Sequence, residues 1–204
     1  MPQPPSSDIA FTPAVKALQT RLGSRRSYAR MEAQGGFRTT ITPDLVLFLA
    51  AQRSFYLATV NAGGQPYIQH RGGPPGFLRA LDDHRLGFAD YGGNRQYISW
   101  GNLSESPKVH LFFMDYTHRR RIKLWGTAEV IEGDPTLIAR LHDPEADGEP
   151  ERAFVITVAA WDINCPQHIP QRFEAEDVAN ALALRDQRIA ALEAEIEALK
   201  ASSV

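Results

Sequence analysis

Cysteine is almost absent from this sequence, since Cys165 is the single one among 204 residues. One cysteine excludes a disulfide within the chain and a cysteine-rich zinc site, and this usage suits a reducing cytoplasm. Long apolar runs are lacking as well, because no segment approaches the ~20 apolar residues that cross a bilayer. Residues 1–8 also lack the basic start and apolar run of a secretory signal. We therefore expect a cytoplasmic protein with no membrane association.

An excess of charge of either sign is missing too. The 22 lysines and arginines are matched by 24 aspartates and glutamates, which leaves a formal net charge of -2. This balance gives no general attraction to nucleic acid or to an anionic membrane, so any anion site must be local. No two of the six histidines have the i, i+4 spacing of a helical metal site, and we expect no metal centre.

A hydrophobic content of 43% over this length is enough for one sizeable core with small additions. Changes in composition divide the chain into an N-terminal extension over residues 1–42, a central domain over residues 43–170 and a C-terminal helix over residues 171–204. The proline- and serine-rich residues 1–8 predict disorder.

Helix starts can be recognised from local signals. Residues 12–23 begin with threonine and proline and end with glycine, which predicts a short helix. The basic residues 25–30 that follow favour a solvated connector, with contact to a phosphate as the alternative. Threonine or aspartate before proline predicts two further helices, over residues 42–51 and residues 134–142.

Strands dominate the central domain. Apolar and polar residues alternate most clearly over residues 122–130, which predicts a strand with one face in the core. Further strands are expected over residues 54–60, 67–70, 78–81, 85–89 and 154–161. The connecting helices are too few and too irregular for parallel crossovers. The pattern therefore predicts a mainly β, α+β fold with an antiparallel sheet that is closed or nearly closed.

One stretch, residues 88–103, carries the strongest chemical signal. An apolar strand end is followed by Gly92 and Gly93, and we expect a helix to open with Asn94, Arg95 and Gln96 in its first turn. A helix N-terminus has unpaired N–H groups and partial positive charge, and an arginine fork adds to both. This combination predicts a phosphate cradle.

Two other segments flank this cradle, namely Gly-Gln-Pro-Tyr-Ile-Gln-His-Arg-Gly-Gly-Pro at 64–74 and the apolar and basic run at 107–126. Their order and spacing resemble the pyridoxamine 5'-phosphate oxidase-like split-barrel flavoproteins, most closely the branch of predicted flavin-nucleotide-binding proteins. The resemblance covers roughly residues 45–170. It implies an FMN-binding split β-barrel and a homodimer with flavin mononucleotide (FMN) at the subunit interface.

The resemblance also assigns cofactor contacts to this sequence. In the family, the first segment wraps the flavin, the strand end contacts ring and phosphate, a polar triplet holds the phosphate, and late residues close over the ring from the partner subunit. The residues that would wrap the flavin are Gln69, His70, Arg71 and Gly72, and the strand end is Phe88, Ala89 and Asp90. The phosphate triplet falls on Asn94, Arg95 and Gln96. The late residues are Arg121 and Trp161.

The segment after the last predicted strand contains further candidates. Asn164 and Gln167 are placed to reach the flavin edge or the substrate, and His168 is our candidate for an acid–base step, because histidine exchanges protons near neutral pH. A plain strand-terminating turn is an equal alternative.

The substrate side departs from the family. Pro74 stands where the pyridoxamine phosphate oxidases have a lysine, and no Arg-x-His motif follows Trp161. The sequence thus predicts an FMN-dependent oxidoreductase for an unknown small substrate, with NAD(P)H as a candidate partner. The alternatives are a non-enzymatic flavin carrier or sensor, or the same barrel with deazaflavin or with haem on His70 or His168.

The C-terminal tail changes to a heptad pattern that only Arg185 interrupts. Apolar residues occupy the two seam positions, at Leu182, Ile189 and Ile196 and at Leu192 and Leu199. A parallel dimer zipper would pair Arg188 with Glu193 and Glu195 with Lys200. The alternative is an amphipathic helix laid on its own barrel.

Overall fold

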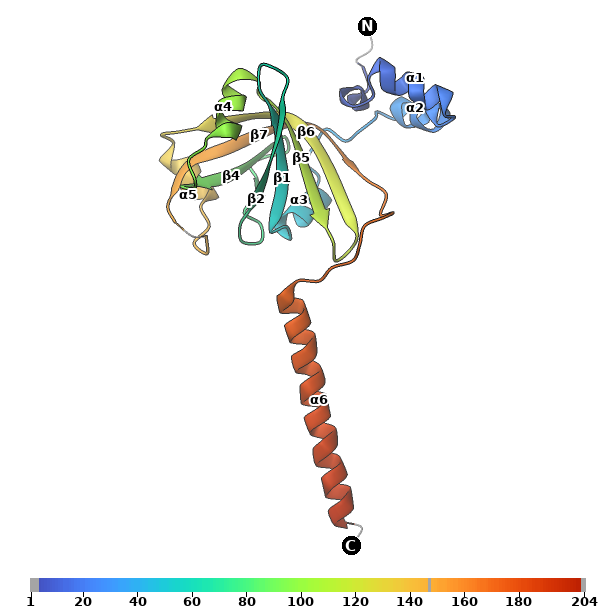
Figure 1. The fold of residues 1–204 in the computed structure, drawn as a ribbon, viewed down its shortest axis with the longest axis vertical. Coiled ribbons are helices and arrows are strands. Elements are labelled where there is room, and N and C mark those ends of the chain that lie inside the picture. The colour runs from blue at the N-terminus through green and yellow to red at the C-terminus, as the bar shows by residue number, and fades with distance from the viewer. Residues whose placement is uncertain (1–3, 147, 203–204) are drawn as a thin grey trace. The chain divides into compact units, whose positions relative to one another are not determined.

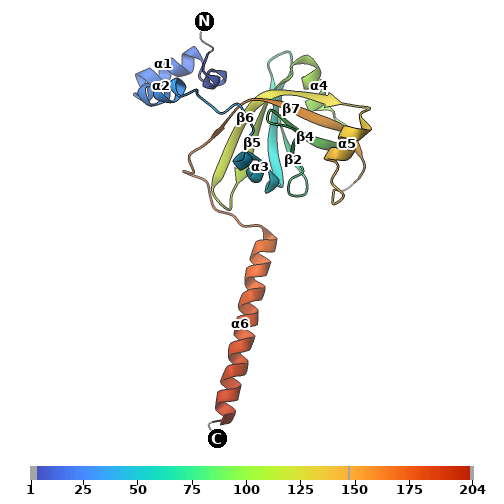
Figure 2. The same cartoon turned by 180° about the vertical axis from the view of Figure 1, so that it is seen from behind.

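The computed structural model describes residues 4–146 and 148–202. The described residues divide into two compact units. Unit 1 comprises residues 4–114 and 121–165 apart from residue 147, and unit 2 comprises residues 115–120 and 166–202. Unit 1 contains the curled sheet with its shorter helices, and unit 2 contains the long C-terminal helix (Figures 1 and 2).

Unit 1 is built on a seven-stranded sheet in the order β2-β1-β5-β6-β7-β4-β3. Its strands are β1 (Ser54–Val60), β2 (Pro66–Gly72), β3 (Arg79–Ala80), β4 (Arg85–Tyr91), β5 (Lys108–Asp115), β6 (Arg120–Ile131) and β7 (Pro150–Ile163). The strand pairs with a described register are antiparallel. The expected mainly β fold with an antiparallel sheet is confirmed.

The longest strand, β7, joins the two halves of the sheet. It pairs with β4 through Asp90↔Arg152 near its start. It pairs with β6 up to Ile122↔Ile163 at its end. The alternating pattern had predicted a strand over residues 154–161 only, because charged residues and a proline precede it. The extra residues at its start belong to the candidate site.

A bulge interrupts the β6–β7 pairing between Trp125 and Gly126. The two backbones approach so closely here that a Cβ added at Gly126 would lie 2.2 Å from the carbonyl oxygen of Thr157. A side chain at this position would therefore collide with backbone rather than with a movable group. Glycine at this point of the strand is required by packing.

The core fills the inside of the curled sheet with aromatic rings. Phe55 contacts Phe77, Phe88 and Phe113 with centroid distances of 5.6, 5.5 and 5.4 Å. Phe88 stacks on Phe154 at 4.9 Å. These five side chains are at least nine-tenths buried. Four of them come from β1, β4, β5 and β7, and Phe77 comes from the connection between β2 and β3. The cluster thus packs beside the part of β4 that carries predicted site residues.

Three helices begin as the sequence predicts, with an oxygen-bearing cap directly before a proline. The helices are α1 (Pro13–Arg21), α3 (Pro43–Ala50) and α5 (Pro135–Leu141). Their caps accept a backbone N–H: Thr12 from Val15 at 3.3 Å, Thr42 from Leu45 at 3.4 Å, and Asp134 from Leu137 at 2.9 Å. Local capping chemistry was therefore sufficient to place them.

The N-terminal extension is more ordered than predicted. Residues Ser6–Ile9 form a 3-10 helix, η1, in which Ser7 is fully buried. The prediction of disorder is wrong for this part, whereas residues 1–3 lie outside the described residues. The expected solvated connector is also wrong, because Arg25–Ala33 form a second helix, α2.

Ion pairs explain this order. The carboxylate of Glu32 accepts hydrogen bonds from Arg25 and lies 3.4 Å from Lys16, which in turn bonds Asp8 at 2.6 Å. The hydrogen bonds from Arg25 hold the pKa of Glu32 below its usual range. The bond to Asp8 raises the pKa of Lys16. Charges from η1, α1 and α2 thus hold the extension together.

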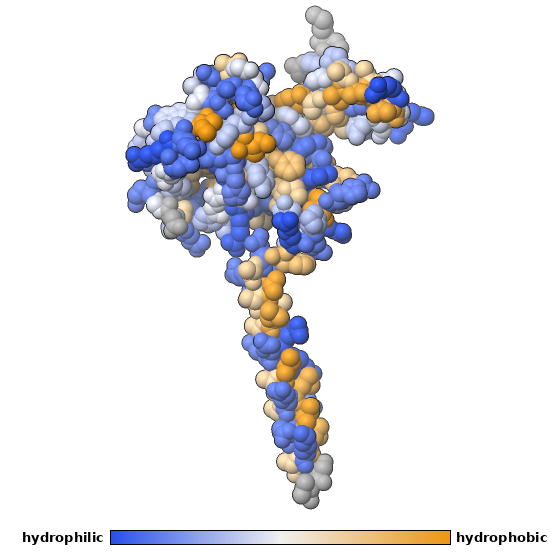
Figure 3. Space-filling model, in the orientation of Figure 1, coloured by the Kyte–Doolittle hydropathy of each residue, from blue (hydrophilic) through white to orange (hydrophobic). Residues whose placement is uncertain are grey.

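Unit 2 consists mainly of α6 (Ala175–Ser202), so the predicted C-terminal helix is present. None of the described residues of α6 is buried. The seam residues Leu182, Ile189 and Ile196 are 47%, 46% and 49% exposed, and Figure 3 shows hydrophobic atoms along this helix. None of the described helices, α6 included, is both long and apolar enough to cross a membrane.

Candidate functional site

The opposite ends of the sheet approach each other at Arg71 and Asp90. Arg71 belongs to the edge strand β2, and Asp90 belongs to β4, next to the other edge. The Nη1 atom of Arg71 donates to Oδ1 of Asp90 at 2.7 Å, and both side chains are less than one-fifth exposed. The two ends of the sheet are thus joined by side chains rather than by a strand ladder. A barrel closed in this way has an opening along the joint.

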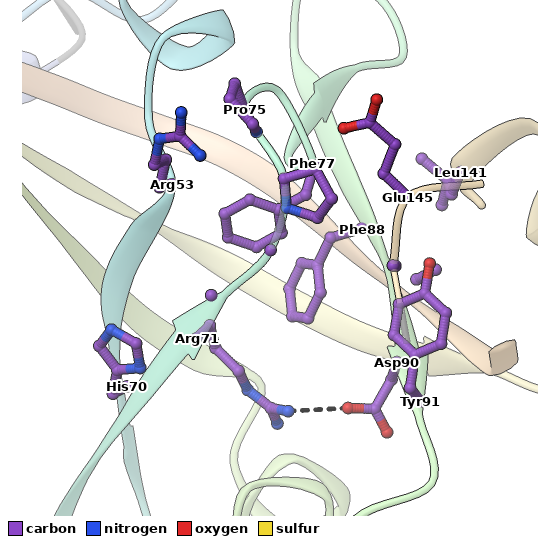
Figure 4. A pocket seen from close by; sticks show the side chains of 15 residues that line it. Arg53, His70, Arg71, Pro75, Phe77, Phe88, Asp90, Tyr91, Leu141 and Glu145 are labelled. Atoms are coloured by element: carbon purple, nitrogen blue, oxygen red, sulfur yellow. Dashed lines mark hydrogen bonds and ion pairs between the residues drawn. The ribbon is translucent and has the colours of Figure 1, made fainter. Parts of the chain in front are cut away.

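A hollow of about 640 Å³ lies at this joint. Figure 4 shows Arg71 and Asp90 pointing toward one another beneath the rings of Phe77 and Phe88. The hollow brings together six of the residues that the sequence predicted for cofactor binding, namely His70, Arg71, Gly72, Phe88, Ala89 and Asp90. These six come from two strands at opposite ends of the sheet.

The guanidinium of Arg71 is held in a fixed plane. It lies over the ring of Phe154 at 4.9 Å and over that of Phe88 at 5.6 Å. Its Nε is buried and has no hydrogen-bond partner within the described residues. A buried donor without a partner costs free energy, and an anionic ligand would satisfy it. Arg71 is therefore oriented by its neighbours and has donor capacity left.

A smaller hollow of about 90 Å³ lies beside the first and shares Arg71, Asp90 and Tyr91 with it. The predicted residues Gln69, Asn94, Arg95 and Gln96 line it. Ten of the predicted cofactor residues are therefore divided between two adjoining hollows. The arginine common to both lies between a larger, partly aromatic space and a smaller, polar one.

The predicted helix start at Asn94 is wrong. Helix α4 spans Ile98–Glu105, and Asn94, Arg95 and Gln96 form a loop before it. The side chain of Asn94 accepts the N–H of Gln96 at 3.2 Å, which favours a turn over a helix. Arg95 has a φ of 57°, in the left-handed region. The anion-binding groups of this segment are thus loop groups close to a helix start.

Arg95 is an accessible cation of the smaller hollow. Its side chain is 71% exposed and lies 3.8 Å from a carboxylate oxygen of Glu151. This separation is an ion pair and is too long for a hydrogen bond. Arg95 can therefore turn to an incoming anion with little loss.

Helix α4 is fastened to the sheet by side-chain hydrogen bonds. Ser99 donates to the amide oxygen of Gln69 at 2.8 Å. Asn102 donates to the hydroxyl of Thr59 at 2.9 Å. The amide oxygen of Gln69 is thus engaged, while its amide nitrogen remains the group that a ligand could use.

Sequence reasoning missed Arg152, which lines the smaller hollow. Arg152 is only 6% exposed, and its guanidinium lies 4.6 Å from the ring of Trp100. One signal in the sequence could have identified Arg152, namely its position in the alternation of inward and outward side chains along β7. It falls on the same side of the strand as Phe154, Ile156 and Val158, which are buried, so an inward charge was implied.

Other predicted residues lie far from the two hollows within unit 1. Arg121 and Asn164 are at the end of the β6–β7 pairing, and the Asn164 N–H donates to the Arg121 carbonyl at 3.1 Å. Arg152 lies at the start of β7, and about 40 Å of extended chain separates it from Asn164. The Nε of Arg121 and Oδ1 of Asn164 are nevertheless buried without a hydrogen-bond partner within the described residues.

Trp161 lies in the core of the barrel. Its ring is 1% exposed, its indole N–H donates to the carbonyl of Thr40 at 2.8 Å, and Arg38 lies over it at 4.7 Å. Within this chain the side chain packs against the core and the segment before α3. Its role as a cofactor contact stays a prediction.

Gln167 and His168 belong to unit 2, where both side chains are exposed. His168 has a φ of 62°, so it occupies a tight turn. Their roles as a binding residue and an acid–base residue stay predictions. Cys165 is exposed as well.

Taken together, these residues form a site suited to an anion, with an aromatic wall, at the joint between the two ends of the sheet. In the smaller hollow, three arginines (Arg71, Arg95 and Arg152) outnumber two carboxylates (Asp90 and Glu151), which leaves one positive charge in excess. Such a site can hold a planar apolar group in the larger hollow and an anionic group in the smaller one.

No curated protein sequence matches the chain significantly. The crystal structure of the HupZ protein of group A Streptococcus is 19% identical, covering 65% of this chain and 99% of that one, with a TM-score of 0.50. An FMN-binding protein from Syntrophomonas wolfei is 12% identical over 72% and 97% of the two chains, with a TM-score of 0.47.

The family model described as pyridoxamine 5'-phosphate oxidase matches residues 41–165, which is more than half of the chain. The matched segment begins just before α3 and ends just after β7, and it includes both hollows. The chain therefore belongs to the pyridoxamine 5'-phosphate oxidase family.

Proposed function

We propose that this chain binds FMN and acts as a flavin-dependent oxidoreductase on a small substrate. The observation that carries the proposal is the pair of adjoining hollows with Arg71 between them. FMN has the same division, because a ribityl chain joins a planar ring system to a dianionic phosphate. Membership of the pyridoxamine 5'-phosphate oxidase family supports the proposal.

The larger hollow suits the ring system. Its volume of about 640 Å³ falls within the range of about 300 to 1,000 Å³ that is usual for cofactor sites. The rings of Phe77 and Phe88 line it, and both belong to the aromatic core. A wall anchored in this way orients a bound ring without having to move.

The smaller hollow suits the phosphate. Arg71 supplies a buried donor from one side, and Arg95 supplies an accessible fork from the other. Arginine forks match phosphate oxygens in pairs, and such charge-assisted bonds are stronger than neutral ones. Gln96 and the backbone N–H groups of the loop before α4 add neutral donors.

When bound, the flavin supplies the redox chemistry. The protein binds, orients and shields the cofactor. Asp90 accepts from Arg71 and keeps its guanidinium in plane over Phe154, so the phosphate contact is set before the ligand arrives. Preorganised donors of this kind need little rearrangement on binding.

We also propose that a second copy of the chain completes the site. Arg121 and Asn164 have buried polar atoms without described partners, yet they lie at the far end of β7 from the hollows. A homodimer can bring these groups from the partner subunit to the flavin. The outer face of β1 and β2 supports this, because Tyr56 and Ile68 are 40% and 64% exposed there.

An absorption spectrum of the purified protein tests the proposal. We expect the two bands of an oxidised flavin, and FMN rather than the dinucleotide after the protein is denatured and its supernatant is chromatographed. Bleaching of the flavin by NAD(P)H in steady state would identify an oxidoreductase rather than a carrier. A colourless protein that takes up no added flavin, or one with a haem or deazaflavin spectrum, would refute FMN as the cofactor.

Removal of the tail after Phe173 separates two sources of dimerisation. We expect the truncated protein to remain a dimer with flavin bound, because the proposed interface is formed by the barrel. The pairs of Arg188 with Glu193 and of Glu195 with Lys200 would add only tenths of a kcal/mol each in a zipper, since exposed ion pairs are weak. Light scattering at micromolar concentration measures the outcome. A flavin-free monomer would show instead that α6 is needed to build the site.

A further inference from the structure

We propose that α6 forms a parallel, in-register, two-stranded coiled coil with α6 of a second copy of this chain. The helix begins at Ala175, after the segment 41–165 that matches the family model, so membership of the family gives it no role. This contact is separate from the proposed barrel interface and does not depend on flavin binding.

The apolar side chains of α6 lie in one stripe. The helix is 28 residues long, which is four heptads. Six of its seven large apolar residues fall on the two seam positions of the heptad, a and d, and Leu184 is the exception. The six are Val178, Leu182, Ile189, Leu192, Ile196 and Leu199, and each is between 39% and 60% exposed. A stripe this regular, left exposed in the single chain, would be buried by a matching helix.

Charges flank the stripe at spacings that suit a second helix. Arg188 and Glu195 occupy g positions. Glu193 and Lys200 occupy the e positions that face them in a parallel pair, so both contacts join opposite charges. Arg188, Glu193 and Glu195 have no opposite charge three or four positions away, so they are not spaced to pair along their own helix. Lys200 differs, because it donates to Glu197 at 2.8 Å. Arg188 with Glu193 is therefore the cleaner pair to test.

Arg185 occupies a seam position and restricts the register. In a parallel pair, a d side chain enters a hole formed by four residues of the facing helix, and one of these is the next e residue. For Arg185 that residue is Asp186 of the partner subunit, whose carboxylate can offset the charge of the guanidinium. A slip by one heptad would place one of the two arginines beside Ala179 instead, without a carboxylate. The pattern thus favours the in-register pair.

Disulfide cross-linking of the full-length protein tests this arrangement. The background is Cys165→Ser, because Cys165 is exposed and could cross-link by itself. In this background we expect Leu199→Cys to give a covalent dimer on mild oxidation with diamide, since parallel helices in register bring both copies of residue 199 together. An antiparallel pair would place residue 199 near residue 182 of the other helix, about 25 Å from its counterpart.

Ala201→Cys in the same background is the matched control, because position 201 lies two residues further on the outer side of the helix. Cross-linking at 199 should be about tenfold faster or more, since groups held face to face have a high effective concentration. Denaturing gels without reductant measure both rates. Equal rates at the two positions, or no cross-link at 199, would overturn the proposal in favour of an antiparallel pair or of a helix laid on its own barrel.

Reversal of one charge tests the pairing across the seam. In the Leu199→Cys background, Arg188→Glu brings two acidic groups together at Glu193 of the partner subunit and should slow cross-linking about two- to tenfold. Adding Glu193→Arg restores opposite charges and should restore the rate. If the double change were as slow as Arg188→Glu alone, the assigned pairing would be wrong.

The absorption spectrum of the same samples keeps this test apart from the flavin proposal. A colourless protein that cross-links through residue 199 would refute flavin binding and leave the coiled coil standing. A protein that carries flavin but does not cross-link at residue 199 would refute the coiled coil alone.

Discussion

Replacement of Gly126 by alanine is expected to lower the free energy of unfolding by about 3 kcal/mol or more, or to prevent folding. The new Cβ would lie 2.2 Å from the carbonyl oxygen of Thr157 and 3.1 Å from its carbonyl carbon. Both atoms belong to the backbone of β7, so relief requires a shift of one strand at the bulge. Urea unfolding, followed by tryptophan fluorescence, measures the loss.

Gly101→Ala is the matched control for this change. Gly101 lies within α4, and nothing is found within 4 Å of a Cβ built there. Alanine is the better helix former by about 1 kcal/mol, so this variant should be as stable as wild type or more stable. If both variants lost stability equally, the collision at the bulge would not be the cause.

The second large effect concerns flavin affinity. We expect Arg71→Met to weaken FMN binding about a hundredfold, whereas Arg95→Ala should cost about tenfold. Arg71 is largely buried, oriented by two rings and equipped with an unused Nε–H, so its bonds to phosphate form with little loss of freedom. The Arg95 side chain is 71% exposed, and solvent screens its contacts. Quenching of flavin fluorescence in a titration gives both affinities.

Arg119→Ala is the control for net charge in this series, because Arg119 lies in unit 2, outside the barrel fragment that holds the two hollows. Its FMN affinity should equal that of wild type. A larger loss for Arg95→Ala than for Arg71→Met would contradict the order of burial that we assign. Circular dichroism on each variant checks that the barrel is folded, since Arg71 also pairs with Asp90.

The parts of the fold that follow from neighbouring residues could be predicted from the sequence. Thr12, Thr42 and Asp134 cap helices because each cap contacts a residue three positions away. The N-terminal order could not be predicted, because it depends on distant partners. Ser6, for example, donates to the carbonyl of Phe37.

The candidate site could likewise be predicted only where neighbouring residues determine it. The family resemblance singled out Arg71 and Asp90 as cofactor contacts, and both line one hollow. No local rule reveals that the two ends of the sheet meet there. The helix expected at Asn94 failed because an asparagine side chain can bond its own backbone and compete with helix formation. Arg152 was missed because a charged residue before an apolar run suggests a loop. Only when β7 is known to begin at Pro150 does the alternation of the strand place the Arg152 side chain on the inner face.

The pairing of Asp90 with Arg152 also affects when the chain can fold during its synthesis. The two residues are 62 positions apart in the sequence, yet they face each other across β4 and β7. At roughly 5 to 20 residues per second, a ribosome needs roughly 3 to 12 s to supply that interval, and β4 has no central partner until then. Contacts so distant along the chain also make barrel closure slow. Both residues line the smaller hollow, so a ligand held there can stabilise only the finished barrel by mass action. Such a ligand can select the folded product but cannot guide the nascent chain toward it.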